Sequence, residues 1–217
     1  MSVEADRTPG SLVEQMARDI QAGVFAPGMW LKQIDLESRY GAKRMEVRRA
    51  LDQLALKRLV RHEPNRGYHV HPLDDRQADE VREVRLILET AAAASVVAHA
   101  TGSDIAALRE LAQRFADLIL DGTLLDLYGA NIAFHVRLLE LSTNQELLNI
   151  VWDLRQRGPS APVTQWKTRA RIELSAREHF LMADAIEAGD VGELRRLMAA
   201  HIQQSGVCNH LAERAGP

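Results

Sequence analysis

The 217-residue chain has a single cysteine, Cys208, and no apolar run long enough to cross a membrane. One cysteine excludes an internal disulfide framework, and such sparing use is typical of a reducing cytoplasm. The first ten residues, MSVEADRTPG, have neither the basic segment nor the apolar segment of a signal peptide. We therefore expect a cytoplasmic protein with no membrane partner.

The net charge of the chain is only −3, but the charges are distributed unevenly. Residues 1–72 carry 12 Lys and Arg against 9 Asp and Glu, whereas residues 73–217 carry 15 against 21. Between Lys43 and Arg66 there are 8 basic residues against 3 acidic ones. A mildly acidic protein with one concentrated basic segment is expected to bind an anionic partner at that end.

The basic segment contains a stretch, residues 41–54, with the period of an amphipathic helix. At 100° per residue, one face is apolar and the opposite face is mostly polar and basic. The apolar face holds Val47, Ala50, Leu51 and Leu54, and the opposite face holds Met45, Arg48, Arg49 and Asp52, with Lys43 and Arg44 at the start. Such a helix can lie in the major groove of DNA, with its first turn at the base edges and the flanking cations on phosphates. Taken alone, the stretch is equally compatible with a solvated surface helix.

The neighbouring segments favour DNA binding. The predicted elements are helices at 11–22, 33–40 and 43–58, and short strands at Leu59–His62 and Tyr68–His71. Ser11 and Glu14 form a capping box for the first helix, and Gly41 makes the turn between the other two. Helix, turn, helix and hairpin in this order predict a winged helix-turn-helix, in which Arg66 at the hairpin tip could enter the minor groove. A simple connector is the alternative interpretation of the hairpin.

Residues 12–70 resemble the winged-helix domain of the GntR family of bacterial transcription regulators. The matching residues are I-x-x-G of Ile20–Gly23, Pro27–Gly28, R-x-x-V-R-x-A-L of Arg44–Leu51, L-x-x-L-V of Leu56–Val60, and Arg66–Gly67. Two positions depart from the family pattern: Lys43 stands where a Ser usually opens the recognition helix, and Glu46 stands where a Pro is usual. Loss of the Ser weakens the N-cap expected for this helix.

Residues 73–217 show only helical periodicity, interrupted by Gly or Pro. The predicted helices span residues 74–100, 103–120, 123–141, 144–157, 165–188 and 190–213. They predict an all-α bundle of six or seven helices, so the fold as a whole is mainly α. Pro72 closes the hairpin and divides a DNA-binding domain, 1–72, from a helical effector-binding and dimerisation domain, 73–217.

The first helix of this bundle carries an arginine, Arg85, within its predicted apolar stripe. The other members of the stripe are Val81, Val84, Leu88, Ala91, Ala92 and Ser95. An arginine that points toward a core needs an anion. The anion could be a bound ligand, or Arg85 could pair with Glu89 one turn on or extend to the edge of the bundle.

Four further polar side chains fall on apolar helix faces. Asn131 and His135 share a face with Leu127 and Leu138, His179 shares one with Met182, Ala183 and Ile186, and His201 shares one with Leu194, Leu197 and Met198. A lone histidine on such a face is more often hydrogen-bonded to a backbone carbonyl. Three of them from three helices favour a divalent metal, which satisfies three buried lone pairs at once.

This half of the chain resembles the FCD ligand-binding domain of the FadR-type branch of the GntR family. The matching motifs are V-x-x-V-R-x-x-L-E of Val81–Glu89, Phe134–His135, N-x-x-L of Asn144–Leu147, Glu178–His179, A-I-x-x-G-D of Ala185–Asp190, and His201–Ile202. Many members of that family bind a metal through Asp, His, His and His, and the metal holds a carboxylate effector. Here Asn131 stands at the Asp position, and its amide oxygen can ligate but brings no negative charge. The metal would then bind more weakly, and the more electropositive site favours an anionic ligand.

Together these patterns predict a homodimeric, ligand-responsive transcription repressor that is not an enzyme. The residues expected to contact a double-stranded DNA operator are Lys43, Arg44, Arg48, Arg49 and Arg66. Those expected to bind a small carboxylate effector are Arg85, Asn131, His135, His179 and His201, the last four through a divalent metal such as zinc or nickel. One alternative is the same regulator with a metal-free effector pocket. The other is a metalloenzyme that activates water, but no acidic residue is placed as its general base, since Glu178 projects about 100° away from His179.

Overall fold

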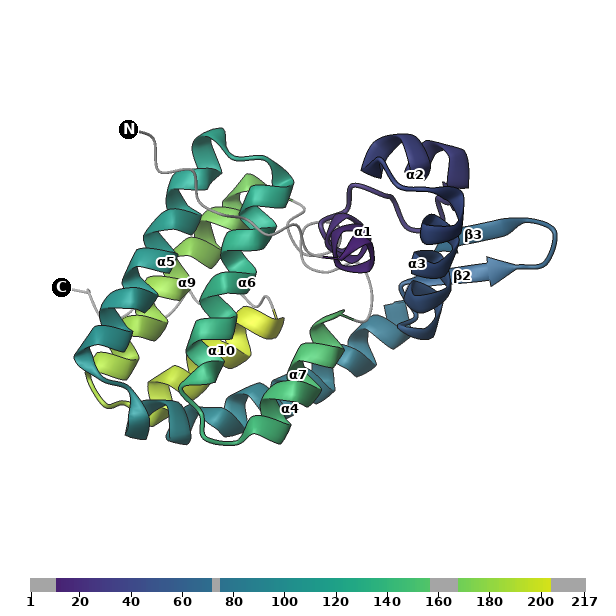
Figure 1. The fold of residues 1–217 in the computed structure, drawn as a ribbon. Helices are drawn as coiled ribbons and strands as arrows, with labels where there is room; N and C mark the ends of the chain where they lie inside the picture. The colour runs from purple at the N-terminus through teal and green to yellow at the C-terminus, as the bar shows by residue number, and fades with distance from the viewer. Residues whose placement is uncertain (1–10, 72–74, 157–167, 204–217) are drawn as a thin grey trace.

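The described residues of the computed structural model, 11–71, 75–156 and 168–203, form nine helices and three short strands. The chain is mainly helical, as predicted, with a winged N-terminal part and a C-terminal helical bundle (Figure 1). No helix in the described ranges combines the length and the apolarity needed to cross a membrane. Parts of the predicted helices, at 74, 157, 165–167 and 204–213, and the predicted boundary at Pro72 lie outside the described residues.

Three helices belong to the N-terminal part: α1 (Leu12–Gln21), α2 (Gln33–Tyr40) and α3 (Arg44–Leu56). α1 begins at the predicted capping box, in which the Ser11 N–H donates to Glu14 Oε2 (2.9 Å) and the Glu14 N–H to Ser11 Oγ (3.3 Å). The turn between α2 and α3 passes through Gly41 at φ = 61°, a left-handed conformation that glycine adopts without strain. The predicted apolar face of α3 is fully buried in one core with Met16 and Ile20 of α1.

The predicted hairpin is present, and a third strand joins it. β2 (Val60–Glu63) and β3 (Gly67–Val70) pair antiparallel, and β1 (Trp30–Leu31) pairs with the other edge of β3, so the sheet order is β1-β3-β2. Leu59 and His71, predicted as strand residues, lie just beyond the strand ends, although the His71 N–H still donates to the Leu59 carbonyl (2.9 Å). The β2–β3 turn projects away from the helices (Figure 1).

Six described helices form the bundle, which confirms the predicted all-α architecture. They are α4 (Asp75–His99), α5 (Gly102–Asp121), α6 (Leu124–Glu140), α7 (Gln145–Gln156), α9 (Arg169–Glu187) and α10 (Val191–Gln203). Their core includes Phe134 and Leu138 of α6, Met182 of α9, and Leu194 and Leu197 of α10, all at 1% exposure or less. The histidine-bearing faces of α6, α9 and α10 are therefore the buried ones, as their periodicity predicts.

The predicted apolar stripe of α4 is partly wrong. Val84 has 43% of its surface exposed and Ala91 is also exposed. Ala92 of the stripe is buried as predicted, but the other buried positions of this helix, Glu89, Ala93 and Val96, lie outside the predicted stripe. Apolar residues occur on all sides of α4, so periodicity alone cannot select the face that packs.

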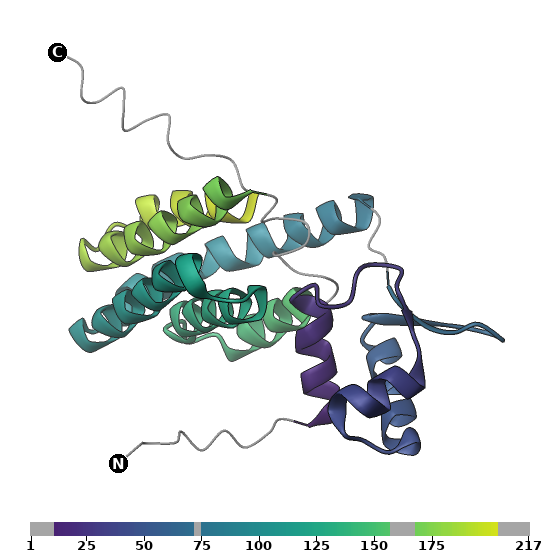
Figure 2. The ribbon, with the colours of Figure 1, turned by 90° about the horizontal axis from the view of Figure 1, so that it is seen from above.

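The helix α1 lies between the bundle and the rest of the N-terminal part (Figure 2). At this junction the hydroxyl of Tyr128, on α6, donates to Gln21 Oε1 at the end of α1 (3.2 Å). Both side chains are buried, with 5% and 4% of their surfaces exposed. The helix that packs on α3 therefore also contacts the bundle.

Candidate DNA-binding surface and buried histidine site

The N-terminus of α3 is capped in an unusual way. The helix begins at Arg44, and Lys43 occupies the N-cap in an extended conformation. A lysine side chain has no acceptor for the free N–H groups of the first turn. Glu46 Oε2, however, accepts a hydrogen bond from the Lys43 backbone N–H (2.7 Å). Glu46 thus supplies half of a capping box at the position where the GntR pattern has a proline.

The five basic residues predicted to bind DNA are all accessible. Exposed basic side chains occur at the N-cap (Lys43), in the first turn of α3 (Arg44) and on the face of α3 away from its core (Arg48 and Arg49). Arg66, on the β2–β3 turn, has 80% of its side chain exposed and lies 3.9 Å from Glu63. The hydroxyl of Tyr68 on β3 donates to Asp52 on α3, which joins the hairpin to the helix.

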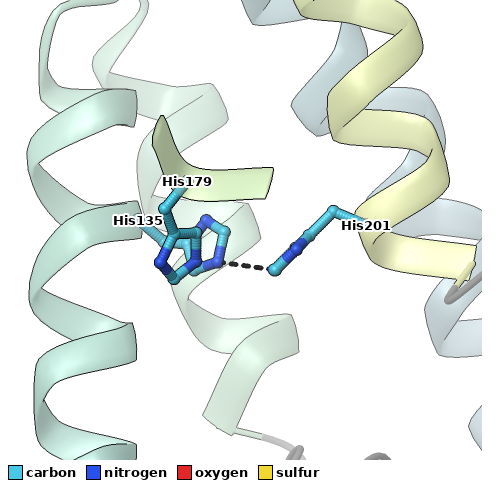
Figure 3. Close-up of side chains that lie close together, drawn as sticks. All are labelled: His135, His179 and His201. Carbon is cyan, nitrogen blue, oxygen red and sulfur yellow. Dashed lines mark hydrogen bonds between the residues drawn. The ribbon is translucent and has the colours of Figure 1, made fainter. Parts of the chain in front are cut away.

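Three imidazoles meet in the centre of the bundle. His135 of α6, His179 of α9 and His201 of α10 point toward one another (Figure 3). One ring nitrogen of each lies within 4.8 Å of the other two, so the three could hold a metal ion. His135 Nε2 and His201 Nε2 are 2.9 Å apart and share a hydrogen bond.

Two of the predicted ligands contain buried polar atoms without a hydrogen-bond partner in the described part of the chain. These atoms are Asn131 Oδ1 and both ring nitrogens of His179. The His179 ring is fixed by Phe134, which stacks on it at a centroid distance of 4.1 Å, and by the edge of Phe115 at 5.1 Å. Each unpartnered buried polar group costs roughly 1–3 kcal/mol. Asn131 precedes His135 by one turn on the buried face of α6, so its unpartnered oxygen and a lone pair of His179 add to the donors that a cation at the triad would use.

The imidazoles are neutral at physiological pH. Burial lowers the pKa of His135 and of His179 well below the ordinary 6.5, and the positive charge of Arg155 acts in the same direction. Burial also lowers the pKa of His201, although its hydrogen bond to Glu178 opposes that change. Neutral imidazole is the form that binds a metal, so protons do not compete for the site near pH 7.

Glu178 orients His201, a role that helical periodicity does not indicate. Glu178 Oε2 lies 2.6 Å from His201 Nδ1, and the carboxylate accepts two hydrogen bonds from Arg171 (3.0 and 2.7 Å). Burial would raise the pKa of Glu178, but His201 and Arg171 together lower it. A carboxylate on Nδ1 leaves the lone pair on Nε2, which is how metal-binding histidines are commonly held. The only local signal in the sequence is an acidic residue among the apolar positions of α9.

Arg85 is engaged in the internal ion pair that was one of its predicted alternatives. Its Nε donates to Glu89 Oε1 (2.9 Å), and Arg155 of α7 donates to both oxygens of the same carboxylate (3.2 and 2.5 Å). Burial would raise the pKa of Glu89, but Arg155 and Arg85 lower it to about 2. Arg155 shares a helix face with Leu148 and Val151 at spacings of three and four residues, which is the sequence signal that marks it as inward-pointing.

A pocket of about 250 Å³ lies between α6 and α7 and reaches the histidine site. Its lining residues are His135, Val136, Leu139, Glu140, Gln145, Leu148, Asn149, Val151, Trp152 and Arg155. Arg155 thus faces both the pocket and Glu89, whereas Arg85 is not among the lining residues.

Comparison with protein families assigns both parts of the chain. The model for bacterial regulatory proteins of the gntR family matches residues 10–70, and the model for the FCD domain matches residues 80–204, more than half of the chain. The chain belongs to the GntR family. It is a transcription regulator that combines the GntR DNA-binding domain with an FCD domain, as its sequence motifs predict.

Named relatives of this GntR regulator are also transcription regulators rather than enzymes. It is 29% identical over 182 residues to the Nta operon transcriptional regulator of Aminobacter aminovorans, and the matched region covers 83% of this chain and 84% of that protein. It is 24% identical over 209 residues to the HTH-type transcriptional repressor RspR of Escherichia coli, with 94% and 92% covered. Among solved structures, E. coli McbR/YncC has the same fold, with a TM-score of 0.78, 23% identity, and 89% and 92% of the two chains covered.

We predict that Glu89→Gln lowers the free energy of unfolding by about 3–5 kcal/mol at pH 7, because it leaves two guanidinium groups around a buried neutral amide. The folded-state pKa of Glu89 lies below the ordinary 4.5, so the stability that its charge contributes is present above pH 4.5. This contribution is lost as the pH falls toward about 2, the folded-state value. Urea unfolding at several pH values measures both effects.

The matched control is Glu173→Gln, which removes the same charge from the exposed Arg169–Glu173 pair. It should change the free energy of unfolding by no more than about 1 kcal/mol. Equal stability of Glu89→Gln and the wild type at pH 7 would contradict the assigned importance of the Glu89 carboxylate.

Proposed function

We propose that this GntR regulator is a homodimeric repressor whose FCD domain senses a small carboxylate through a divalent metal. The domains would divide near residue 72, and the operator would be read in the cytoplasm by α3 and the β2–β3 turn. The relative RspR is named a repressor, which supports that direction of control. Dimerisation is proposed because one recognition helix reads only a few base pairs, and useful affinity needs two half-sites at a fixed spacing.

The observation that supports the metal best is the combination of three converging imidazoles with unpartnered buried atoms beside them. The proposed ligands are Asn131 Oδ1 and one nitrogen each from His135, His179 and His201. Three imidazoles and an amide oxygen suit zinc or nickel. A bound metal would supply positive charge and free coordination positions for a carboxylate. Glu178 and Arg171 would hold His201 in the orientation that this requires.

Substitution of Asn131 separates the metal site from a metal-free pocket. With zinc present, Asn131→Asp should raise both zinc affinity and the melting temperature, because the carboxylate adds a negative charge to the ligand set. Without any metal, the same substitution buries an uncompensated carboxylate and should destabilise the fold by about 3–5 kcal/mol. Melting curves and zinc titrations of the chelator-treated protein test this. A fall in melting temperature that neither zinc nor nickel reverses would overturn the metal proposal.

His179→Ala should abolish zinc binding, since it removes one of the three proposed imidazole ligands, whose ring is 0% exposed. The matched control is His99→Ala, because His99 is an exposed histidine at the end of α4. The control should bind zinc as the wild type does. Undiminished zinc binding by His179→Ala would place the metal elsewhere.

Arg44→Ala and Arg48→Ala should each weaken operator binding by about 1–3 kcal/mol if these side chains contact bases. Arg66→Ala should weaken binding with a smaller loss of sequence preference. The operator for this test is a duplex selected from random DNA by the wild-type protein, and binding is measured at fixed salt. Arg114→Ala, which removes an exposed arginine from α5, is the control and should bind normally. Normal operator binding by all three test variants would contradict the proposed reading surface.

The hydrogen bond between Tyr128 and Gln21 is our proposed route from the effector site to the DNA-binding domain. Tyr128, Asn131 and His135 lie on one face of α6 at spacings of three and four residues. A change in the position of α6 on ligand binding would reach Gln21 and hence α1, which packs on α3.

Tyr128→Phe keeps the ring but removes the hydroxyl, so it should reduce the coupling between the two sites without abolishing either. We expect the ratio of operator affinities with and without zinc to move toward one by up to about tenfold, the value of one hydrogen bond. Zinc affinity itself should change little. An unchanged ratio in Tyr128→Phe would show that the coupling follows another route.

A further inference from the structure

The pocket between α6 and α7 has a buried floor and an exposed rim. His135, Leu139, Val151 and Arg155 are buried at the floor, whereas Glu140 and Trp152 are exposed at the rim. At about 30 Å³ per water in the liquid, its volume of about 250 Å³ holds about eight waters. That is room for a carboxylate carrying one ring or a short branched chain.

The floor of this pocket carries an excess of positive charge. Glu89 is the one carboxylate in the described ranges that hydrogen bonds to Arg85 and Arg155, so a single negative charge faces two guanidinium groups. Arg155 has 7% of its side chain exposed and Arg85 has 15%. A buried cation without a full counter-charge is costly and attracts an anion. Arg155 is the member of the pair that lines the pocket.

The other lining residues favour a ligand whose remaining part is apolar. Half-buried Val136 and Leu148 also line the pocket, and Trp152 adds an exposed aromatic side chain. The other formal charge in the lining is the carboxylate of Glu140. A ligand with a second or third carboxylate would bring that group toward Glu140 and be repelled, since like charges are unfavourable at close range.

We propose that the pocket binds a monocarboxylate with a single small apolar group, such as one aromatic ring. Its carboxylate pairs with Arg155 beside His135, and its apolar group packs against Leu148 and Trp152. This proposal rests on the proposed function, because it takes the carboxylate to be the effector. It adds which class of carboxylate binds and which residues determine that choice. Arg155 forms the charged contact, and Glu140 sets the preference for one carboxylate over several.

Titration calorimetry of the full-length, zinc-loaded protein tests the ligand class. Benzoate and phenylacetate should bind at least about tenfold more tightly than benzamide, which has the same shape without the charge. They should also bind more tightly than succinate and citrate. Equal affinity for benzamide and benzoate, tighter binding of citrate than of benzoate, or no binding of either aryl carboxylate would overturn the proposal.

Two variants test the pocket itself. Arg155→Gln leaves Glu89 balanced by Arg85, so the fold should persist, and benzoate affinity should fall at least about tenfold. Leu148→Trp fills the space for the ring and should abolish benzoate binding. Arg114→Gln, on the surface of α5, is the control and should bind benzoate normally. Wild-type benzoate affinity in folded Arg155→Gln and Leu148→Trp would overturn the proposal.

The variant Glu140→Gln tests the preference for ligands with one carboxylate. It should bind succinate several-fold more tightly than the wild type does, with benzoate affinity nearly unchanged, because it removes the repelling charge. Succinate affinity that does not increase would overturn the role of Glu140.

This inference and the proposed function fail in different ways. Benzoate that binds through Arg155 but leaves operator affinity unchanged supports the pocket and overturns the carboxylate-sensing repressor. Zinc-dependent control of operator affinity by citrate, with wild-type citrate response in Arg155→Gln, supports the regulator and overturns the pocket.

Discussion

The burial of three neutral imidazoles at the meeting point of α6, α9 and α10 is the constraint that organises the bundle. Each neutral ring has one donor and one acceptor, and neither can be left to water. The described residues satisfy only part of this demand. His135 and His201 share one hydrogen bond, and His201 Nδ1 forms another with Glu178. Both ring nitrogens of His179 are without a partner among the described residues. The stacking of Phe134 nevertheless holds the His179 ring in place. A rigid ring with an unused donor and an unused lone pair is costly for stability alone, which is the physical basis for proposing a ligand here.

Charged groups surround the triad in two clusters with different net charge. Glu178 and Arg171 form a balanced pair on the α9 side, whereas Glu89 is outnumbered by Arg85 and Arg155. The unbalanced cluster has two consequences. After burial, which is the largest cause, the charge of Arg155 in this cluster further lowers the pKa of His135 and His179, and the cluster favours an anion close to them. A metal on the imidazoles would strengthen that attraction, so metal and carboxylate should bind cooperatively in this site.

Much of this architecture can be predicted from sequence because it depends on local periodicity. The burial of α3 through Val47 and Leu51, and the inward direction of the three histidines, follow from spacings of three and four residues. Pairings between distant residues cannot be read this way. Arg155 and Glu89 are 66 residues apart, and Glu178 and His201 are 23 apart, so only the packing of helices brings them together. The buried face of α4 is predicted only in part for a different reason, since apolar residues all round a helix do not indicate which side packs.

The two halves of the chain are joined through a helix that serves both. Met16 and Ile20 of α1 are fully buried in the core that supports α3, while Gln21, at the end of the same helix, accepts a hydrogen bond from Tyr128 of α6. A ligand can change the conformational equilibrium of the DNA-binding half only if it binds two arrangements of this junction with different affinities. A pocket on α6 itself meets that condition most directly, because its occupant contacts the helix that carries Tyr128 and two of the proposed metal ligands, Asn131 and His135. In the proposed function, therefore, the effector changes the position of α6, and this change alters the affinity of the protein for its operator.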